Sequence, residues 1–254
     1  MLELTHISVC YGDAPALEDV SLPFLPGEVL AVIGPNGGGK STLLKAACGL
    51  LPLAGGRVQI DGQDLGGMPP KAVARAVAYL PQSRPVPDIT AERMVLHGRF
   101  PHLGWPRRFG RRDREIVQRA LKAVDAAELG GRSMQELSGG QRQKVYLAMA
   151  LAQETETVLM DEPTTYLDIA HQLQLTRLAR ALADQGKAVV LVMHDLPLAL
   201  CAADRIAVLS RGRLVRTGTP EEVYESGVIP EVFGVTLERI EAGGRIRYFC
   251  GGEV

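Results

Sequence analysis

The sequence is poor in cysteine and aromatic residues and has no marked excess of charge of either sign. Its four cysteines, Cys10, Cys48, Cys201 and Cys250, lie far apart and have no metal-ligand spacing, which argues against a zinc site or a disulfide framework. Reduced thiols in a cytosolic protein are therefore expected. The formal net charge of −1 gives no general attraction to nucleic acid, so we expect no nucleic-acid partner.

The sequence also lacks an uninterrupted apolar run long enough to cross a bilayer. The longest such stretch, residues 188–203, is broken by His194, Asp195 and Pro197. The opening residues Met1–Thr5 have neither the basic start nor the apolar core of a signal peptide. If a membrane matters to this protein, we expect a partner to supply it.

The chain is organised around a glycine-rich segment, GPNGGGKST, that follows the apolar strand-like run Val29–Ile33 and precedes an apolar helix over 43–51. Glycines let backbone N–H groups close round a phosphate, and the dipole of the following helix favours the same anion. In such a loop Lys40 would add a charge between the β- and γ-phosphates, and the Ser41 hydroxyl would be a ligand for Mg²⁺. The alternative is a glycine-rich turn without a ligand. The expected phosphate-binding residues are Gly34, Pro35, Asn36, Gly37, Gly38, Gly39, Lys40, Ser41 and Thr42.

Polar residues stand at the ends of three further apolar runs. Asp161 and Glu162 follow residues 157–160, where Asp161 suits a direct or indirect Mg²⁺ role and Glu162 suits polarising an attacking water. His194 ends another run and is placed to donate to the γ-phosphate, and Gln82 ends a third. Structural alternatives remain, because strand-end acids also cap helices, and single histidines and glutamines are usually structural or solvated.

Two more features suggest contacts with a nucleotide. Ser138 is a candidate helix N-cap, and the two glycines after it leave the first N–H groups of helix 144–152 open to an anion. Tyr11, in a turn, is the best candidate for stacking on the adenine ring, although turn aromatics are usually packing residues. A simple capped helix is the competing interpretation for residues 138–152.

Alternating strand-like and helical runs predict an α/β fold with a mostly parallel sheet in a single domain spanning 1–254. Strand-like runs at 2–10, 20–24 and 57–60 suggest a small antiparallel lobe. Helical stretches at 90–98 and 113–127, flanking a loop over 99–112, form an insert that we place at about 83–150. We also expect a loop over 164–168, a hairpin over 205–217, and a C-terminal tail of about 228–254 that ends in a hairpin.

Five arginines crowd together beside the only tryptophan, Trp105, and Phe109. They are Arg107, Arg108, Arg111, Arg112 and Arg114. A solvated face is one interpretation of this cluster. The other is a docking surface for a membrane partner or for anionic headgroups.

Taken together, these motifs resemble the nucleotide-binding subunit of the ATP-binding cassette family over essentially the whole chain. GPNGGGKST resembles the Walker A loop, residues 137–143 the family signature, and residues 158–162 Walker B, within a P-loop NTPase fold. Gln82, Asp168 and His194 fall where the family has its Q-loop, D-loop and switch histidine. One departure is Gly38, where the family more often has serine. The resemblance implies that Gln82 joins Ser41 and Asp161 at the magnesium, and that Ser138, Gly139, Gly140, Gln141 and Asp168 help to bind ATP.

The resemblance also implies partners. Two such chains would pack head to tail, with each ATP between Lys40 of one chain and Ser138 and Gly140 of the other, on the cytoplasmic face of two membrane permease subunits served by a substrate-binding protein. Residues 98–102, 163–172 and 232–235 resemble importers of ferric siderophores, haem and cobalamin. Alternatives are a subunit for another solute or an exporter, a soluble cassette ATPase acting on DNA or ribosomes, and a non-hydrolysing nucleotide-binding module.

Overall fold

The computed structural model describes residues 1–164 and 167–253, and a six-stranded sheet lies at its centre. The strand order is β10-β9-β3-β8-β7-β6, and every neighbouring pair is parallel except β10 with β9. The expected mostly parallel α/β fold is confirmed. The strands are β3 (Val29–Ile33), β6 (Val77–Leu80), β7 (Thr157–Asp161), β8 (Ala188–Val192), β9 (Arg205–Ser210) and β10 (Arg213–Gly218).

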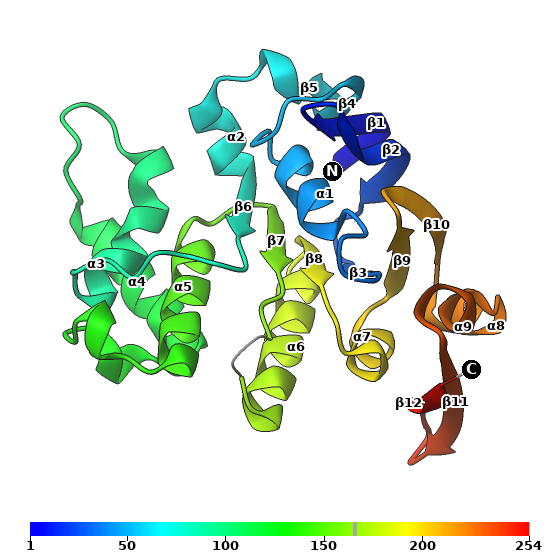
Figure 1. Ribbon diagram of the computed structural model, residues 1–254. Coiled ribbons are helices and arrows are strands. Elements are labelled where there is room, and N and C mark those ends of the chain that lie inside the picture. The colour runs from blue at the N-terminus through cyan, green and yellow to red at the C-terminus, as the bar shows by residue number, and fades with distance from the viewer. Residues whose placement is uncertain (165–166, 254) are drawn as a thin grey trace.

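Both faces of this sheet are covered by apolar side chains, as its continuous hydrophobic strands predict. Along β3, alternate side chains serve different layers: Val29, Ala31 and Ile33 pack with α6 and α7, while Leu30 and Val32 pack with α1. Figure 1 shows these helices on opposite sides of the sheet. They are α1 (Lys40–Ala47), α6 (Ile169–Asp184) and α7 (Leu196–Ala202).

Helix α1 is shorter than the apolar run that predicted it. It ends at Ala47, and Gly49 adopts a φ of 72°, which turns the chain away from the helix axis. Leu50 is therefore 62% exposed rather than part of the helix. Hydrophobicity alone did not reveal this stop, since the apolar run continues to Leu51.

The small antiparallel lobe is present, with strand order β2-β1-β4-β5. The second strand was predicted from Val20, but it begins at Ala14, because Tyr11 pairs with Ala14 across a tight turn. His6 has a φ of 51° where the β1–β2 register shifts, so Leu4 and Ile7 both face the core. The elements are β1 (Leu2–Tyr11), β2 (Ala14–Phe24), β4 (Gly55–Ile60), β5 (Gln63–Asp64), η1 (Leu65–Gly67) and α2 (Pro70–Ala76).

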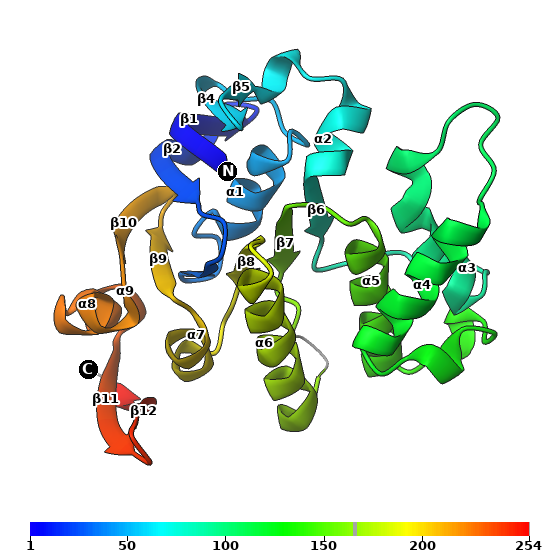
Figure 2. The same cartoon turned by 180° about the vertical axis from the view of Figure 1, so that it is seen from behind.

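A helical segment lies between β6 and β7 in sequence and to one side of the sheet in both views (Figure 2). This helical insert is present at the expected place, but its connecting loop is shorter than predicted. Residues 99–102, expected as loop, belong to a 3₁₀ helix, and Arg99 is buried there at 4% exposure. The elements are α3 (Ala91–Leu96), η2 (His97–His102), α4 (Arg111–Ala123), η3 (Ala127–Leu129), η4 (Met134–Glu136) and α5 (Gly139–Ala152).

The C-terminal part contains the two expected hairpins and one helix that was not expected. Helix α9 lies between Gly227 and Gly234, both of which have positive φ, and its six residues include Pro230. So short a segment carries too little periodicity to be recognised from sequence. Tyr248 of the last strand is buried and lies 5.5 Å from the Tyr224 ring. The elements are α8 (Pro220–Glu225), α9 (Val228–Phe233), β11 (Val235–Ala242) and β12 (Arg245–Glu253).

Two of the predicted segments include residues that lie outside the described part of the chain. The loop expected at 164–168 includes Thr165 and Tyr166, which lie outside them, and the expected tail extends one residue past Glu253. Within residues 1–164 and 167–253, none of the helices is both long and apolar enough to cross a bilayer.

Candidate functional site

The glycine-rich loop connects the end of β3 to the start of α1, as predicted. A side chain at Gly34 would place its Cβ 2.1 Å from the Leu209 carbonyl oxygen of β9, so only glycine fits. Gly39, at the N-cap of α1, has a φ of 101°, and a Cβ there would meet the Ala16 carbonyl oxygen at 2.9 Å. The backbone of the loop therefore runs close against β9 at Gly34 and against β2 at Gly39.

Lys40 is the first residue of α1, and its side chain lies in the loop itself. Its ammonium group donates to the carbonyl oxygens of Gly34 at 2.7 Å and Pro35 at 2.9 Å, and the residue is 6% exposed. Burial lowers the pKa of Lys40, while the charge of Glu162 acts against that shift. Since the helix N-terminus lies beside this cation, the loop suits a polyphosphate.

The Ser41 side chain and the strand-end carboxylate of Asp161 come together as predicted for a magnesium site. Ser41 donates to Asp161 Oδ1 at 3.1 Å, and Tyr79 donates to Oδ2 at 3.2 Å. Asp161 is 2% exposed, and burial raises its pKa. Hydroxyl and carboxylate oxygens are ligands that Mg²⁺ prefers, so this donor set fits that ion.

No group of three His, Cys, Asp or Glu side chains that could hold a metal occurs among the residues described. A magnesium at this position would therefore complete its shell with phosphate oxygens and water, as is usual for that ion.

Glu162, directly after β7, meets two residues that come from other strand ends. His194 Nε2 lies 2.5 Å from Glu162 Oε1, and the Gln82 amide donates to Oε2. Gln82 was predicted to join Ser41 and Asp161 at a magnesium, but here its amide contacts Glu162. Glu162 has a φ of 49°, a conformation that costs free energy for a non-glycine residue and is concentrated at functional sites.

These residues line one open cleft of about 1020 Å³ at the carboxyl edge of the sheet. Tyr11 is half-exposed at its rim, with its hydroxyl 3.5 Å from Thr42 Oγ1, so an aromatic face and the phosphate loop share the same space. A cleft of this size, with a cationic loop, a carboxylate and an aromatic rim, suits a nucleoside triphosphate. The predicted residues on its wall are Tyr11, Asn36, Gly37, Gly38, Gly39, Lys40, Ser41, Thr42, Gln82, Glu162 and His194.

A second set of cleft residues, from β2 and from the turn between β9 and β10, was not predicted from the sequence. They are Pro15, Ala16, Glu18, Arg211 and Gly212. The Gly212 N–H donates to the Gly38 carbonyl at 3.1 Å, so this turn braces the phosphate loop. A single arginine in a hairpin turn carries no signal of a site, because only the packing of the turn against the loop brings Arg211 to the cleft.

We expect Arg211→Ala to weaken ATP binding about fivefold without changing kcat, because an exposed cation near phosphates contributes up to about 1 kcal/mol. Titration with a fluorescent ATP analogue measures the dissociation constant. Arg216→Ala is the matched control, since Arg216 is exposed on β10 and does not line the cleft. Equal affinities in the two variants would exclude a nucleotide contact by Arg211.

The residues expected at the signature segment lie on a different part of the chain. Ser138 caps α5, accepting the Gln141 N–H at 3.3 Å, while the Gln141 side chain accepts the Ser138 N–H at 3.0 Å. Asp168 caps α6 and pairs with His171 at 2.7 Å, and hydrogen bonds to His171 lower the pKa of Asp168. Ser138, Gly139, Gly140, Gln141 and Asp168 do not line the cleft of their own chain. Their expected role requires a second copy.

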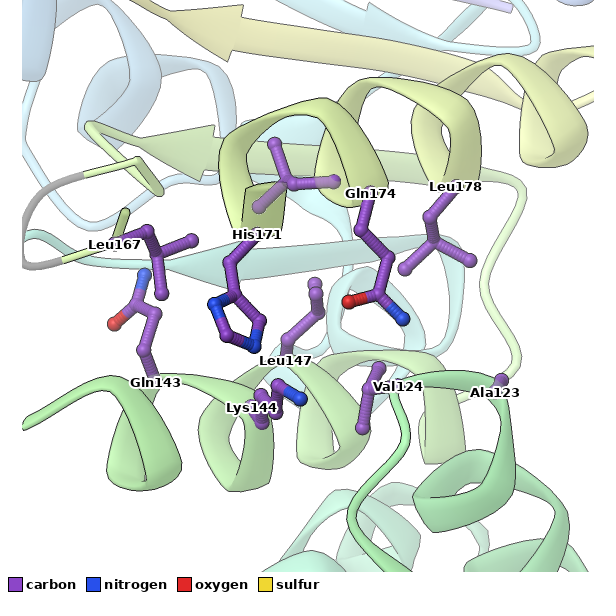
Figure 3. A pocket seen from close by; sticks show the side chains of 10 residues that line it. Ala123, Val124, Gln143, Lys144, Leu147, Leu167, His171, Gln174 and Leu178 are labelled. Carbon is purple, nitrogen blue, oxygen red and sulfur yellow. The ribbon is translucent and has the colours of Figure 1, made fainter. Parts of the chain in front are cut away.

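A second hollow, between α5 and α6, is apolar and far smaller than the cleft. Leu147, Leu167 and Leu178 form part of its wall, and His171 and Gln174 point from α6 toward α5 (Figure 3). Its volume of about 30 Å³ has room for about one water molecule. The functional site is therefore placed in the cleft.

Comparison with known proteins gives consistent matches. A family model described as ABC transporter matches residues 17–165. A hemin import ATP-binding protein of Rhodococcus jostii is 43% identical over 94% of this chain and 82% of its own length. A probable siderophore transport system ATP-binding protein of Bacillus subtilis is 38% identical over 91% and 85%. A dimeric bacterial ABC transporter cassette has a TM-score of 0.77 and 28% identity, covering 87% of this chain and 99% of that one.

Proposed function

This chain belongs to the ABC transporter family, and from that premise we propose that it powers the import of a ferric siderophore or a related metal chelate such as haem. The observation that carries the proposal is the convergence of Lys40, Ser41, Glu162 and His194 on one triphosphate-sized cleft, with Asp161 buried behind it and hydrogen-bonded to Ser41. The cargo class is supported by relatives named for siderophore, hemin and ferric enterobactin transport. Their similarity extends over nine-tenths of the chain, well beyond the ATP-binding motifs.

In the proposed reaction the chain acts mainly by position and charge. The loop N–H groups and Lys40 bind the phosphates, while Tyr11 stacks on the adenine. Ser41 and Asp161 would hold the magnesium, with Gln82 as a third ligand after it leaves Glu162. Bound there, the ion would neutralise charge on the β- and γ-phosphates.

Glu162 is the proposed acceptor of the proton from the attacking water, and His194 the proposed donor of a hydrogen bond to the γ-phosphate. Their contact at 2.5 Å keeps both groups at the same end of the cleft. Gln82, bonded to the other Glu162 oxygen, limits the rotation of the carboxylate. Before nucleotide binds, the three side chains therefore lie in contact at one end of the cleft.

The complete ATP site is proposed to need two copies of the chain. The N-terminus of α5, with Gly139 and Gly140 in its first turn, offers N–H donors that no residue of its own chain's cleft uses. A partner's α5 would supply them to the γ-phosphate, and the dimeric state of the cassette relative supports the pairing of two copies. Two permease subunits, a substrate-binding protein and a location at the cytoplasmic membrane face complete the proposal.

Transport into vesicles tests the cargo. The chain, reconstituted with the permease encoded beside its gene, is expected to drive ATP-dependent uptake of a labelled ferric siderophore, haem or cobalamin. Uptake of none of these chelates, with ATP hydrolysis intact, would refute the cargo class but leave the ATPase assignment in place.

ATPase activity coupled instead to DNA or ribosomes would favour the soluble cassette ATPases. The absence of a coiled-coil or zinc insert argues against those proteins, because only about a hundred residues separate Lys40 from Ser138.

A further inference from the structure

Residues Gly104–Arg108, with the sequence GWPRR, form the exposed end of the loop between η2 and α4, and we call them the tip loop. All of its residues are exposed, whereas Leu103 just before it is buried. In both ribbon views this loop projects from the helical segment, at the same end of the molecule as α2 (Figures 1 and 2). It is a protruding feature and not part of the cleft wall.

The two ends of the tip loop are firmly held. On the N-terminal side, the carbonyl oxygens of Pro101 and Leu103 accept hydrogen bonds from Arg75 and Lys71 of α2. On the C-terminal side, the Phe109 ring stacks on Phe100 at 5.7 Å. Because both ends are fixed, the tip loop is presented outward in a defined place at little entropic cost on binding.

Two carboxylates of the helical segment, Asp113 and Glu154, contact a buried cation. Arg99 lies 3.0 Å from Asp113 and 2.9 Å from Glu154, and it also donates to the Ala152 carbonyl. Asp113 accepts the Gly110 N–H as well. Asp113 is therefore engaged by Arg99, and Glu154 is shared between Arg99 and the exposed Arg119, which lies 3.5 Å away at the far end of α4 from the tip loop.

The exposed arginines therefore form a cationic patch with little compensation. Arg111 pairs with Glu115, but both are largely exposed, so the pair contributes little. Within the described part of the chain, Arg107, Arg108, Arg112 and Arg114 have no carboxylate within 4 Å. Lys71 and Arg75 of α2 also anchor the loop, so the same corner gains two further positive charges. This local excess contrasts with the net charge of −1 for the whole chain.

Trp105 stands in the middle of this patch, and its side chain is 93% exposed. Tryptophan is enriched at membrane–water interfaces, where its ring sits at the level of the headgroups. A projecting indole flanked by arginines matches a surface with anionic groups outside and apolar groups beneath. We propose that the tip loop and the first turn of α4 bind anionic phospholipid headgroups, with Trp105 entering the interfacial layer.

A membrane surface fits these observations better than a protein partner does. A soft anionic layer accepts a convex loop with unpaired guanidinium groups, and it does not require a matching cavity. Each arginine near such a surface strengthens binding about fivefold, so four of them give an effect on the order of several hundredfold. This surface is distinct from the cleft, and lipid binding does not depend on nucleotide.

The single tryptophan makes the test direct, because Trp105 emission reports on the tip loop without a label. Protein is mixed with vesicles of phosphatidylcholine alone or of an equal mixture with phosphatidylglycerol. The mixed vesicles are expected to shift the emission to the blue and to protect it from acrylamide quenching, and phosphatidylcholine alone to do neither. About 1 M NaCl, where the Debye length is about 3 Å, is expected to reverse the change.

A fourfold variant, Arg107→Gln, Arg108→Gln, Arg111→Gln and Arg112→Gln, is expected to lose at least 100-fold in vesicle affinity and to keep its ATPase rate. The charge-matched control replaces Arg57, Arg132, Arg177 and Arg216, all exposed and elsewhere, and is expected to bind vesicles like the parent. The absence of a shift with anionic vesicles, or an equal loss in both variants, overturns the proposal. A shift seen only when the vesicles also contain the permease overturns it in favour of a protein-docking surface.

Discussion

Glu162→Gln is expected to lower the rate of ATP hydrolysis at least 100-fold and to leave ATP binding within about twofold of the parent. Glutamine keeps the size of the side chain and can still hydrogen-bond to Gln82 and His194, but it cannot accept a proton from water. The loss corresponds to at least about 2.7 kcal/mol in the activation barrier. Steady-state phosphate release and equilibrium ATP binding measure the two quantities.

The same variant is expected to accumulate as an ATP-bound dimer, because the triphosphate that we propose joins two copies is no longer cleaved. Size-exclusion chromatography with magnesium and ATP checks this. Glu156→Gln is the matched control, since Glu156 is exposed just before the same strand and is not in the cleft. Hydrolysis within tenfold of the parent would refute the role of Glu162. A monomer that still binds ATP would refute the two-copy site.

Mixing two inactive variants is expected to restore ATP hydrolysis, and this is the strongest test of the shared site. Lys40→Ala removes the loop cation that is proposed to contact the phosphates, whereas Gly140→Asp places a negative charge where α5 would meet the γ-phosphate. An acidic residue in the first turn suits the helix, so this second variant is expected to fold. Each variant alone is expected to lose at least 100-fold in rate.

In the mixture, half of the dimers contain one chain of each kind. Both substitutions then fall in one composite site, and the other site is intact, so about a quarter of the parent rate is expected. The control is each variant assayed alone at the same total protein concentration. A mixture no faster than either variant would mean that Lys40 and Gly140 act within one chain. ATP binding by Gly140→Asp alone, measured in parallel, shows that its cleft is intact.

The order of the motifs and the type of most elements followed from the sequence. Glycine spacing gave the phosphate loop, and apolar runs ending in polar residues placed Gln82, Glu162 and His194 at one sheet edge, where the structure brings them into contact. Periodicity did not give boundaries: β2 starts at Ala14, α1 stops at Ala47, and α9 has too few residues to show a period. These limits arise from strand pairing and from glycine turns, which depend on neighbours that are distant in sequence.

Arg99 and Arg211 show what pattern alone could not reveal. Arg99 was expected in a loop with the exposed arginines, yet it is buried because Asp113 and Glu154 converge on it from α4 and the end of α5. Arg211 had no signal, and it reaches the cleft only because Gly212 is bonded to the phosphate loop. The burial of Arg99 and the position of Arg211 at the cleft both depend on which segments pack together in the folded chain.

The sequence by itself determined the chemistry of this protein: a phosphate loop, strand-end acids, a capped signature helix and membership of a family of ATP-binding subunits. Tertiary structure alone decided which arginines are paired and buried and which remain on the surface, which residues of β2 and of the β9–β10 turn line the cleft, and that the residues at the N-terminus of α5 do not line the cleft of their own chain. The physical reason is that local composition fixes the groups available for binding and catalysis. Burial, pairing and orientation depend on contacts between segments as much as 195 residues apart, such as Glu18 and Arg213.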